Sequence, residues 1–152
     1  MNLLLDTNII LNIVRAKNYD AVRHFINPEN LSLYTSIVVE AEIRSLALRH
    51  QWGANRINHL NHFLDAVNII EVNEFSVPGY VKIDSYSQQL NSNVGANPFN
   101  SARNMGKNDL WIASLALLLE LKLITTDADF DHLHNVFFEV RKIKPEEFDQ
   151  FY

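Results

Sequence analysis

Two carboxylates follow short apolar runs that are typical of buried strands. Asp6 comes directly after residues 3–5, and Asp127 comes shortly after residues 123–125. The carboxyl ends of parallel strands meet at one edge of a sheet, where ligands of such sheets bind. We therefore expect both acids at that edge. The conservative interpretation of each acid taken alone is an ordinary turn residue at the end of a strand.

Three further acids are expected near the same edge. Glu42 falls early in the helix that follows the second strand, and Asp109 falls in the first turn of a later helix. An acid in the first turn is also favoured by the helix dipole, so Asp109 alone has a conservative interpretation. Asp129 lies two residues beyond Asp127 and could join the group. Together the five acids predict a carboxylate cluster.

A cluster of this kind requires positive charge. Two carboxylates about 5 Å apart repel each other by about 3 kcal/mol at an effective dielectric constant near 20, so the group needs protons or a cation. Ligand sets made only of oxygen suit Mg²⁺ or Mn²⁺ rather than Zn²⁺. One or two such ions could activate water for phosphodiester hydrolysis, which needs no side-chain nucleophile. Without these five acids the chain would have 13 acids against 13 Lys and Arg, so its net charge of −5 belongs largely to this site.

The elements that must position these acids alternate along the chain. Helices are predicted from near Ile9 to Val14 and over 20–26, 37–50, 54–67, 78–90 and 109–121, with one more helical turn in 145–152. Strands are predicted over 3–5, 31–35, 68–72 and 123–125 and near 136–140. This alternation predicts an α/β fold with a central parallel sheet covered by helices on both faces. The length fits a single domain over 1–152.

Residues 91–107 differ from the rest because they are rich in Asn, Gly and Ser and lack periodicity. A loop this long in a compact domain is typical of a functional or mobile insertion. Arg103 and Lys107 lie at its end beside Asp109, where they could contact the phosphates of RNA. The alternative for each is dispersed solubilising charge. Other basic residues considered as phosphate contacts are Arg15, Lys17, Arg44, Arg49 and Arg56.

The composition excludes several classes of site and partner. With no cysteine, the chain cannot form a disulfide, a thiolate zinc site or an iron–sulfur cluster. The net charge of −5 excludes nucleic-acid binding through overall charge, although a local basic patch remains open. No apolar stretch approaches the roughly 20 residues of a membrane span, and no targeting segment is evident. We therefore expect no membrane association and a cytoplasmic location.

Four short motifs occur in the order in which PIN-domain nucleases have them. Their opening motif is similar to Asp6-Thr7-Asn8, and their second is similar to Ser36-Ile-Val-Val-Glu-Ala-Glu42-Ile. The third resembles Asn108-Asp109-Leu-Trp-Ile-Ala-Ser, and the fourth resembles Thr125-Thr-Asp127-Ala-Asp129-Phe. Each motif alone is weak, but the four in order cover nearly the whole chain. The resemblance is greatest to the small VapC-type toxins of bacterial toxin–antitoxin pairs.

The resemblance implies a PIN-like three-layer α/β/α fold and a magnesium- or manganese-dependent endoribonuclease that hydrolyses RNA. It also implies a homodimer with a cognate antitoxin protein as partner. By position, the catalytic and metal-binding acids would be Asp6, Glu42, Asp109 and Asp127, with Asp129 as an alternative or additional ligand. Side chains that could support these ligands or position water are Thr7, Asn8, Ser36 and Thr125. The segment before Asp109 is longer than is usual in the family.

Other interpretations fit parts of the pattern. A phosphatase of the haloacid dehalogenase type also begins with a strand that ends in Asp, but it needs a second Asp where this chain has Asn8. A phospho-receiver domain needs paired acids near the start and a lysine after a late strand, and the chain has neither. The remaining alternative is a catalytically silent PIN fold that only binds RNA or protein. All four motif acids are present, which favours the nuclease.

Overall fold

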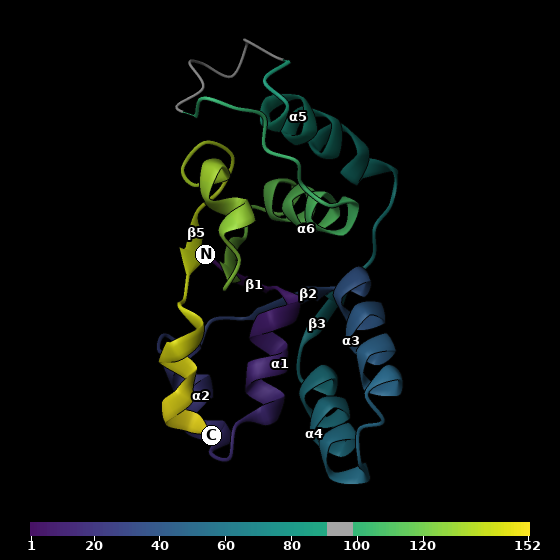
Figure 1. Cartoon of the computed structure of the whole chain (residues 1–152), viewed down its shortest axis with the longest axis vertical. Coiled ribbons are helices and arrows are strands. Elements are labelled where there is room, and N and C mark those ends of the chain that lie inside the picture. Colours follow the sequence, from purple (N-terminus) through teal and green to yellow (C-terminus); the bar gives the residue numbers. More distant parts are fainter. Residues whose placement is uncertain (91–98) are drawn as a thin grey trace.

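The computed structural model describes residues 1–90 and 99–152. Within these residues, five strands form one parallel sheet in the order β3-β2-β1-β4-β5 (Figure 1). Their bounds are β1 Leu3–Leu5, β2 Leu33–Ser36, β3 Asn68–Ile70, β4 Lys122–Thr125 and β5 Val140–Lys142. The predicted central parallel sheet is confirmed.

Helices cover both faces of this sheet. Their bounds are α1 Thr7–Arg15, α2 Tyr19–Ile26, α3 Ile37–Arg49, α4 Ala54–Asp65, α5 Val77–Ser87 and α6 Lys107–Leu118, with shorter 3-10 helices at Glu74–Ser76, Ala128–Leu133 and Pro145–Phe151. Helices α1 to α4 lie on one side of the sheet, and α5 and α6 lie on the other (Figure 1). Right-handed crossovers require this arrangement, because the chain runs from β1 toward β3 in one direction and toward β5 in the other. The fold is therefore the predicted three-layer α/β/α type.

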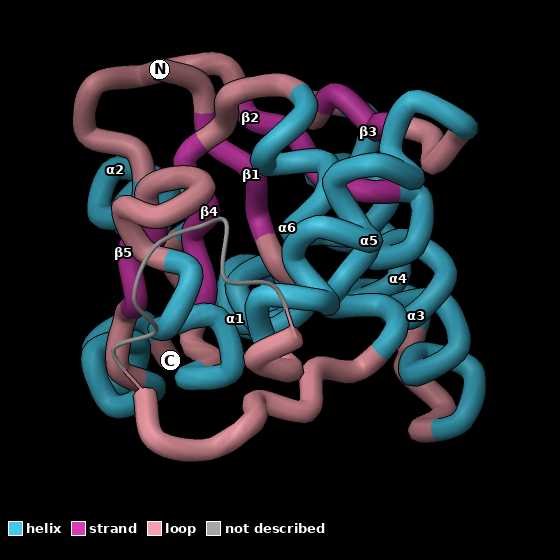
Figure 2. Tube along the Cα trace, turned by 90° about the horizontal axis from the view of Figure 1, so that it is seen from above, coloured by secondary structure: helices cyan, strands magenta, loops and turns pink. Residues whose placement is uncertain are grey.

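The strand order reverses between β1 and β4, which lie side by side at the centre of the sheet (Figure 2). Open α/β sheets bind their ligands in the crevice beyond the carboxyl ends of the strands at such a reversal. The register pairs Leu5 with Ile124, and the backbone N–H of Asp6 then donates to the carbonyl of Ile124 at 3.1 Å. The ends of these two strands are therefore fixed next to each other.

The apolar runs of the two central strands are buried on both faces, as their unbroken hydrophobicity predicts. Leu4, Leu5, Leu123 and Ile124 have no exposed surface. Full burial of one such side chain contributes about 1.5–3 kcal/mol to stability. Helix α6 is buried almost all round, because it lies between the sheet and α5 (Figure 1). The strands and helix that position the candidate site thus belong to the core.

The last strand is the clearest error of the sequence prediction, because β5 covers Val140–Lys142 rather than the region near 136–140. Asn135 has a left-handed backbone (φ 59°), and the N–H groups of Val136 and Phe137 both donate to the carbonyl of Leu133. The chain therefore turns where the strand was expected. The ring of Phe137 packs edge-on against Tyr86 of α5, so this apolar run anchors a turn to the neighbouring helix.

The boundary before α6 also differs from the prediction. The helix begins at Lys107 with Gly106 as its N-cap, so Lys107 belongs to the helix and not to the loop predicted over 91–107. Residues 91–98 of that loop lie outside the described part of the chain, and the proposed role of the loop stays a prediction. The first strand lies at its predicted bounds, and the other predicted elements are present with their ends shifted. No described helix is long and apolar enough to cross a membrane.

Candidate metal centre

An open cavity of about 720 Å³ lies beyond the carboxyl ends of β1 and β4. Four of the five predicted acids contribute to its wall, and the fifth, Asp129, lies beside two of them. Its lining residues are Asp6, Thr7, Asn8, Val38, Ala41, Glu42, Ser45, Leu46, Arg49, Asn108, Asp109 and Asp127. The fold therefore brings together acids that are far apart in the sequence.

Asp6 is the most deeply buried of these acids, with 5% of its surface exposed. It is the N-cap of α1, and its Oδ1 accepts from the backbone N–H of Thr7 at 2.7 Å. Its Oδ2 accepts from the hydroxyl of Thr125 at 2.8 Å. Burial raises the pKa of Asp6, the two hydrogen bonds lower it, and the charges of Asp127 and Glu42 raise it, with a net upward shift. The carboxylate is thus held in one orientation by two donors.

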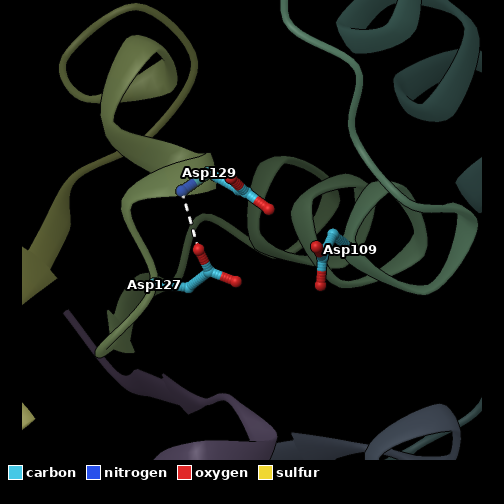
Figure 3. A group of neighbouring side chains, drawn as sticks. All are labelled: Asp109, Asp127 and Asp129. Atoms are coloured by element: carbon cyan, nitrogen blue, oxygen red, sulfur yellow. Dashed lines mark hydrogen bonds between the residues drawn. The ribbon is translucent and has the colours of Figure 1, made fainter.

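Three other acids bring their carboxylates together. Asp109 lies in the first turn of α6, while Asp127 and Asp129 follow β4 (Figure 3). One carboxylate oxygen from each of the three lies within 4.8 Å of the others. The backbone N–H of Asp129 donates to Oδ1 of Asp127 at 2.9 Å (Figure 3). The pKa of Asp109 is raised to about 7, first by burial and then by the charges of Asp6, Asp127, Asp129 and Glu42, in that order. The charge of each of the four other acids therefore contributes to the raised pKa of Asp109.

This donor set fits a hard divalent cation. It contains only carboxylate oxygens, which are the ligands that Mg²⁺ and Mn²⁺ prefer. Burial and the charges of the neighbouring acids both raise the pKa of Asp109, and a bound divalent cation would offset both effects. Among the described residues, Asp6 and Glu42 line the same cavity but do not belong to the group of three close oxygens.

Glu42 is held by two side-chain donors at the side of the cavity. The hydroxyl of Thr7 donates to its Oε2 at 2.5 Å, and the amide of Asn108 donates to its Oε1 at 2.5 Å. Glu42 thereby connects α3 to the beginnings of α1 and α6. Asn108 is a contact that the sequence reasoning missed, although its place beside Asp109 in the third motif was a usable signal.

The predicted supporting residues behave differently from one another. Thr125 is fully buried, donates to Asp6, and accepts from the backbone N–H of Asp127 at 3.0 Å. Asn8 is exposed on the cavity wall. Ser36 is the N-cap of α3, where its Oγ accepts from the N–H of Val38 at 3.0 Å, and it does not line the cavity. Ser36 can therefore act on the site only through α3.

The two basic residues that the sequence predicts as RNA contacts, Arg103 and Lys107, lie in different places relative to the cavity. Lys107 borders an adjoining depression of about 440 Å³ together with Glu42 and Asp109. Arg103 lies outside both linings, with its guanidinium 5.6 Å from the ring centre of Phe99. Among the residues that line the main cavity, Arg49 is the basic one. It follows Glu42 by two helical turns on α3, a spacing that places both on one face.

Comparison with known proteins adds a family and a set of related folds. The model of the protein family described as "PIN domain" matches residues 3–135 of the chain. No curated protein sequence matches it.

Several solved structures share the fold. A chain of "VapBC2 from Rickettsia felis bound to a DNA fragment from their promoter" is 22% identical, with a TM-score of 0.71 over 93% of this chain and 98% of that chain. A chain of VapBC-1 from nontypeable Haemophilus influenzae is 24% identical, with a TM-score of 0.69 over 93% and 98%. A chain of VapBC-5 from Mycobacterium tuberculosis is 23% identical, with a TM-score of 0.57 over 95% and 99%. At such identities the likeness concerns the fold.

Proposed function

The chain belongs to the PIN domain family, and from this premise we propose that it is a metal-dependent endoribonuclease and the toxin of a toxin–antitoxin pair. The observation that supports this most directly is the meeting of Asp109, Asp127 and Asp129 within 4.8 Å, in reach of a cavity that Asp6 and Glu42 also line. One or two Mg²⁺ or Mn²⁺ ions would balance this charge.

The role of each acid follows from how it is held. Asp109 is half-buried with a pKa of about 7, so divalent metal would compete with a proton for its carboxylate at neutral pH. Asp127 faces the main cavity, while the exposed Asp129 stands beside it as a further ligand. We assign both to metal binding. Asp6 and Glu42 complete the acidic wall, each with two hydrogen-bond donors that limit its movement.

When bound, Mg²⁺ or Mn²⁺ supplies Lewis acidity that lowers the pKa of water and stabilises charge on a phosphate. The chain's own residues supply orientation. Thr125 and the N–H of Thr7 fix Asp6, while the side chains of Thr7 and Asn108 fix Glu42, so mutual repulsion cannot push these acids apart. The amide of Asn8 on the cavity wall can orient water or a phosphate oxygen.

Arg49 gives the cavity a place for substrate phosphate. Arg49 lines the same cavity as the acids, two turns along α3 from Glu42. A guanidinium binds phosphate by paired hydrogen bonds as well as by charge. An RNA strand that crosses the site would therefore contact Arg49 on one side of the scissile bond. Lys107 borders the adjoining depression and could contact the strand on another side.

The antitoxin assignment rests on the related structures. VapBC-5 is described as a member of the VapBC family of toxin–antitoxin systems. We extend this to a cognate antitoxin for the present chain, while the proposed homodimer rests on the resemblance of its motifs to VapC-type toxins. Exposed apolar side chains at Phe75, in the 3-10 helix before α5, and at Val77 and Val81 in α5 are consistent with a protein partner.

The decisive experiment is cleavage of total RNA with Mg²⁺ or Mn²⁺, comparing wild type with Asp6→Asn and Asp109→Asn. Asparagine keeps the shape of each side chain but removes the charge that metal needs, so we expect cleavage to fall by at least about 100-fold. EDTA should also abolish it. Asp149→Asn is the matched control, because Asp149 is exposed in the C-terminal segment away from the cavity.

Each outcome has a definite meaning. Discrete fragments that depend on metal and on both acids would support the nuclease and begin to identify the RNA. Cleavage that survives in both variants would point to contamination or to a different site. No cleavage together with no Mn²⁺ binding would favour the alternative, a catalytically silent PIN fold that binds RNA or protein.

A further inference from the structure

A half-buried histidine lies in a cluster of aromatic and polar side chains outside the cavity. His132 belongs to the 3-10 helix after β4, three residues beyond Asp129. Its ring is parallel to that of Tyr86 with 6.2 Å between centres, and it meets Phe99 edge-on at 5.4 Å. Its Nε2 lies 2.7 Å from the hydroxyl of Ser87, the last residue of α5, which has no exposed surface.

His132 connects α5 to the segment that carries Asp129. Its Nε2 lies within hydrogen-bonding distance of the hydroxyl of Ser87 in α5. His132 and Asp129 belong to the same short 3-10 helix, Ala128–Leu133, which follows β4. Burial and the nearby charge of Arg103 lower the pKa of His132 to about 4, while the charge of Asp131 and a hydrogen bond with the backbone of Asp129 raise it.

Ser87 also contacts the segment that leads to Asp109. Its carbonyl accepts from the backbone N–H of Arg103 at 2.7 Å, and its hydroxyl lies 3.4 Å from the sulfur of Met105. Met105 directly precedes Gly106, the N-cap of α6, and Asp109 lies in the first turn of that helix. Ser87 therefore contacts both the segment before Asp109 and, through His132, the segment with Asp129.

We propose that Ser87 and His132 form a positioning pair that sets the separation between Asp109 and Asp129, and thereby the affinity of the site for divalent metal. The inference rests on the proposed metal site. Neither side chain lines the cavity, so neither touches metal or substrate. The three carboxylates repel one another across two separate segments, and the pair ties these segments to one residue of α5. Ligands held at a fixed spacing bind metal more tightly than ligands that must first be drawn together.

The test measures Mn²⁺ binding by titration calorimetry for wild type, Ser87→Ala, His132→Phe and the double variant. Phenylalanine keeps an aromatic ring between Tyr86 and Phe99 but removes both ring nitrogens. We expect each single variant to bind Mn²⁺ about 10-fold more weakly. The double variant should lose little more than either single variant, because the two residues act as one unit. High Mg²⁺ should restore RNA cleavage in the variants.

The matched control is Asn27→Ala. Asn27 is buried and exchanges two hydrogen bonds with the backbone of Leu31, at 2.8 and 2.9 Å, near the amino ends of the strands. Its loss should lower the unfolding temperature without changing Mn²⁺ affinity. Ser87→Ala removes only a hydroxyl, so it keeps the test valid should His132→Phe fail to fold.

The outcomes separate this proposal from the proposed function. If wild type binds Mn²⁺ and cleaves RNA while Ser87→Ala and His132→Phe bind Mn²⁺ equally well and merely unfold at a lower temperature, like the control, the pair is structural and the positioning proposal is wrong. If wild type itself binds no Mn²⁺, the proposed metal site fails and the positioning role fails with it. Weaker Mn²⁺ binding confined to the pair would support the proposal.

Discussion

At the scale of single residues, the hydroxyl of Thr125 uses both of its hydrogen-bonding functions between two acids. It donates to Asp6 at 2.8 Å and accepts from the N–H of Asp127 at 3.0 Å. No water can replace it easily, since Thr125 is fully buried. A buried polar group that loses its partner costs about 1–3 kcal/mol, so this contact matters to stability as well as to the site.

Thr125→Val therefore tests the contact with little change in shape. We expect the free energy of unfolding to fall by about 1–3 kcal/mol and Mn²⁺ binding to weaken by about 10-fold. Urea unfolding and titration calorimetry measure the two effects. Thr125→Ser keeps the hydroxyl and should stay close to wild type in metal affinity. Wild-type Mn²⁺ affinity in the valine variant would show that Asp6 needs no help from this side chain.

The sequence predicted the acids of the candidate site better than their partners. Asp6 and Asp127 could be found because a charged residue within two positions of the end of a buried strand has few places to occupy. Asn108 and Arg49 depend on where α3 meets the cavity, and that placement is a long-range property of packing. Arg103 stood near Asp109 in sequence, yet its guanidinium lies over Phe99, because a loop residue can turn either way.

At the scale of elements, α3 brings one acid and one cation to the cavity and depends on how it begins. Its N-cap, Ser36, ends β2 and accepts from the N–H of Val38. The direct passage from strand to helix fixes the rotation of α3 about its axis. That rotation decides whether Glu42 and Arg49 face the cavity.

Ser36→Ala should lower the free energy of unfolding by about 1 kcal/mol, the usual cost of losing a cap. Because Ser36 touches no acid, we expect RNA cleavage to fall less than in Thr125→Val. Ser36→Thr keeps a capping oxygen and serves as the control. Thermal unfolding and the cleavage assay together check this order, and a larger loss of cleavage in Ser36→Ala would mean that the cap holds Glu42 in place.

The alternation of strands and helices could be predicted from the sequence because the two central strands are unbroken apolar runs. The last strand was not, because Phe137 and Phe138 look like strand residues but pack a turn. The pattern of apolar residues along a short segment does not show whether such a side chain faces a sheet or a neighbouring helix. Here the long-range contact between Phe137 and Tyr86 places the side chain against α5.

At the scale of the whole molecule, the acidic group should make stability depend on pH and metal. The pKa of Asp109 rises from its ordinary value of 3.8 to about 7 on folding, so the folded chain holds this proton more tightly. Its contribution to stability is therefore present at low pH and is lost as pH rises from about 4 to 7. His132 has the opposite effect, because its pKa is lowered from 6.5 to about 4 on folding. Its contribution to stability is present above pH 6.5 and is lost as the pH falls from 6.5 to about 4.

Asp109→Asn isolates the first effect from the second. Without divalent metal, we expect the variant to unfold about 2–4 °C above wild type at pH 8, with the difference shrinking toward pH 5. Added Mn²⁺ should raise the unfolding temperature of wild type more than that of the variant. Differential scanning calorimetry at several pH values measures both. A temperature difference that stays constant across this range would refute the linkage.

The pairing of β1 with β4 also has a consequence for how the molecule is made. The hydrogen bond from Thr125 to Asp6 spans 119 residues, so a growing chain exposes one partner long before the ribosome adds the other. At about 5–20 residues per second, the interval is about 6–24 seconds. Throughout that time β1 can pair with β2 but lacks β4, its neighbour on the other side, and the carboxylates stay apart. The proposed nuclease would therefore stay inert until the ribosome had added Thr125, the residue that holds Asp6.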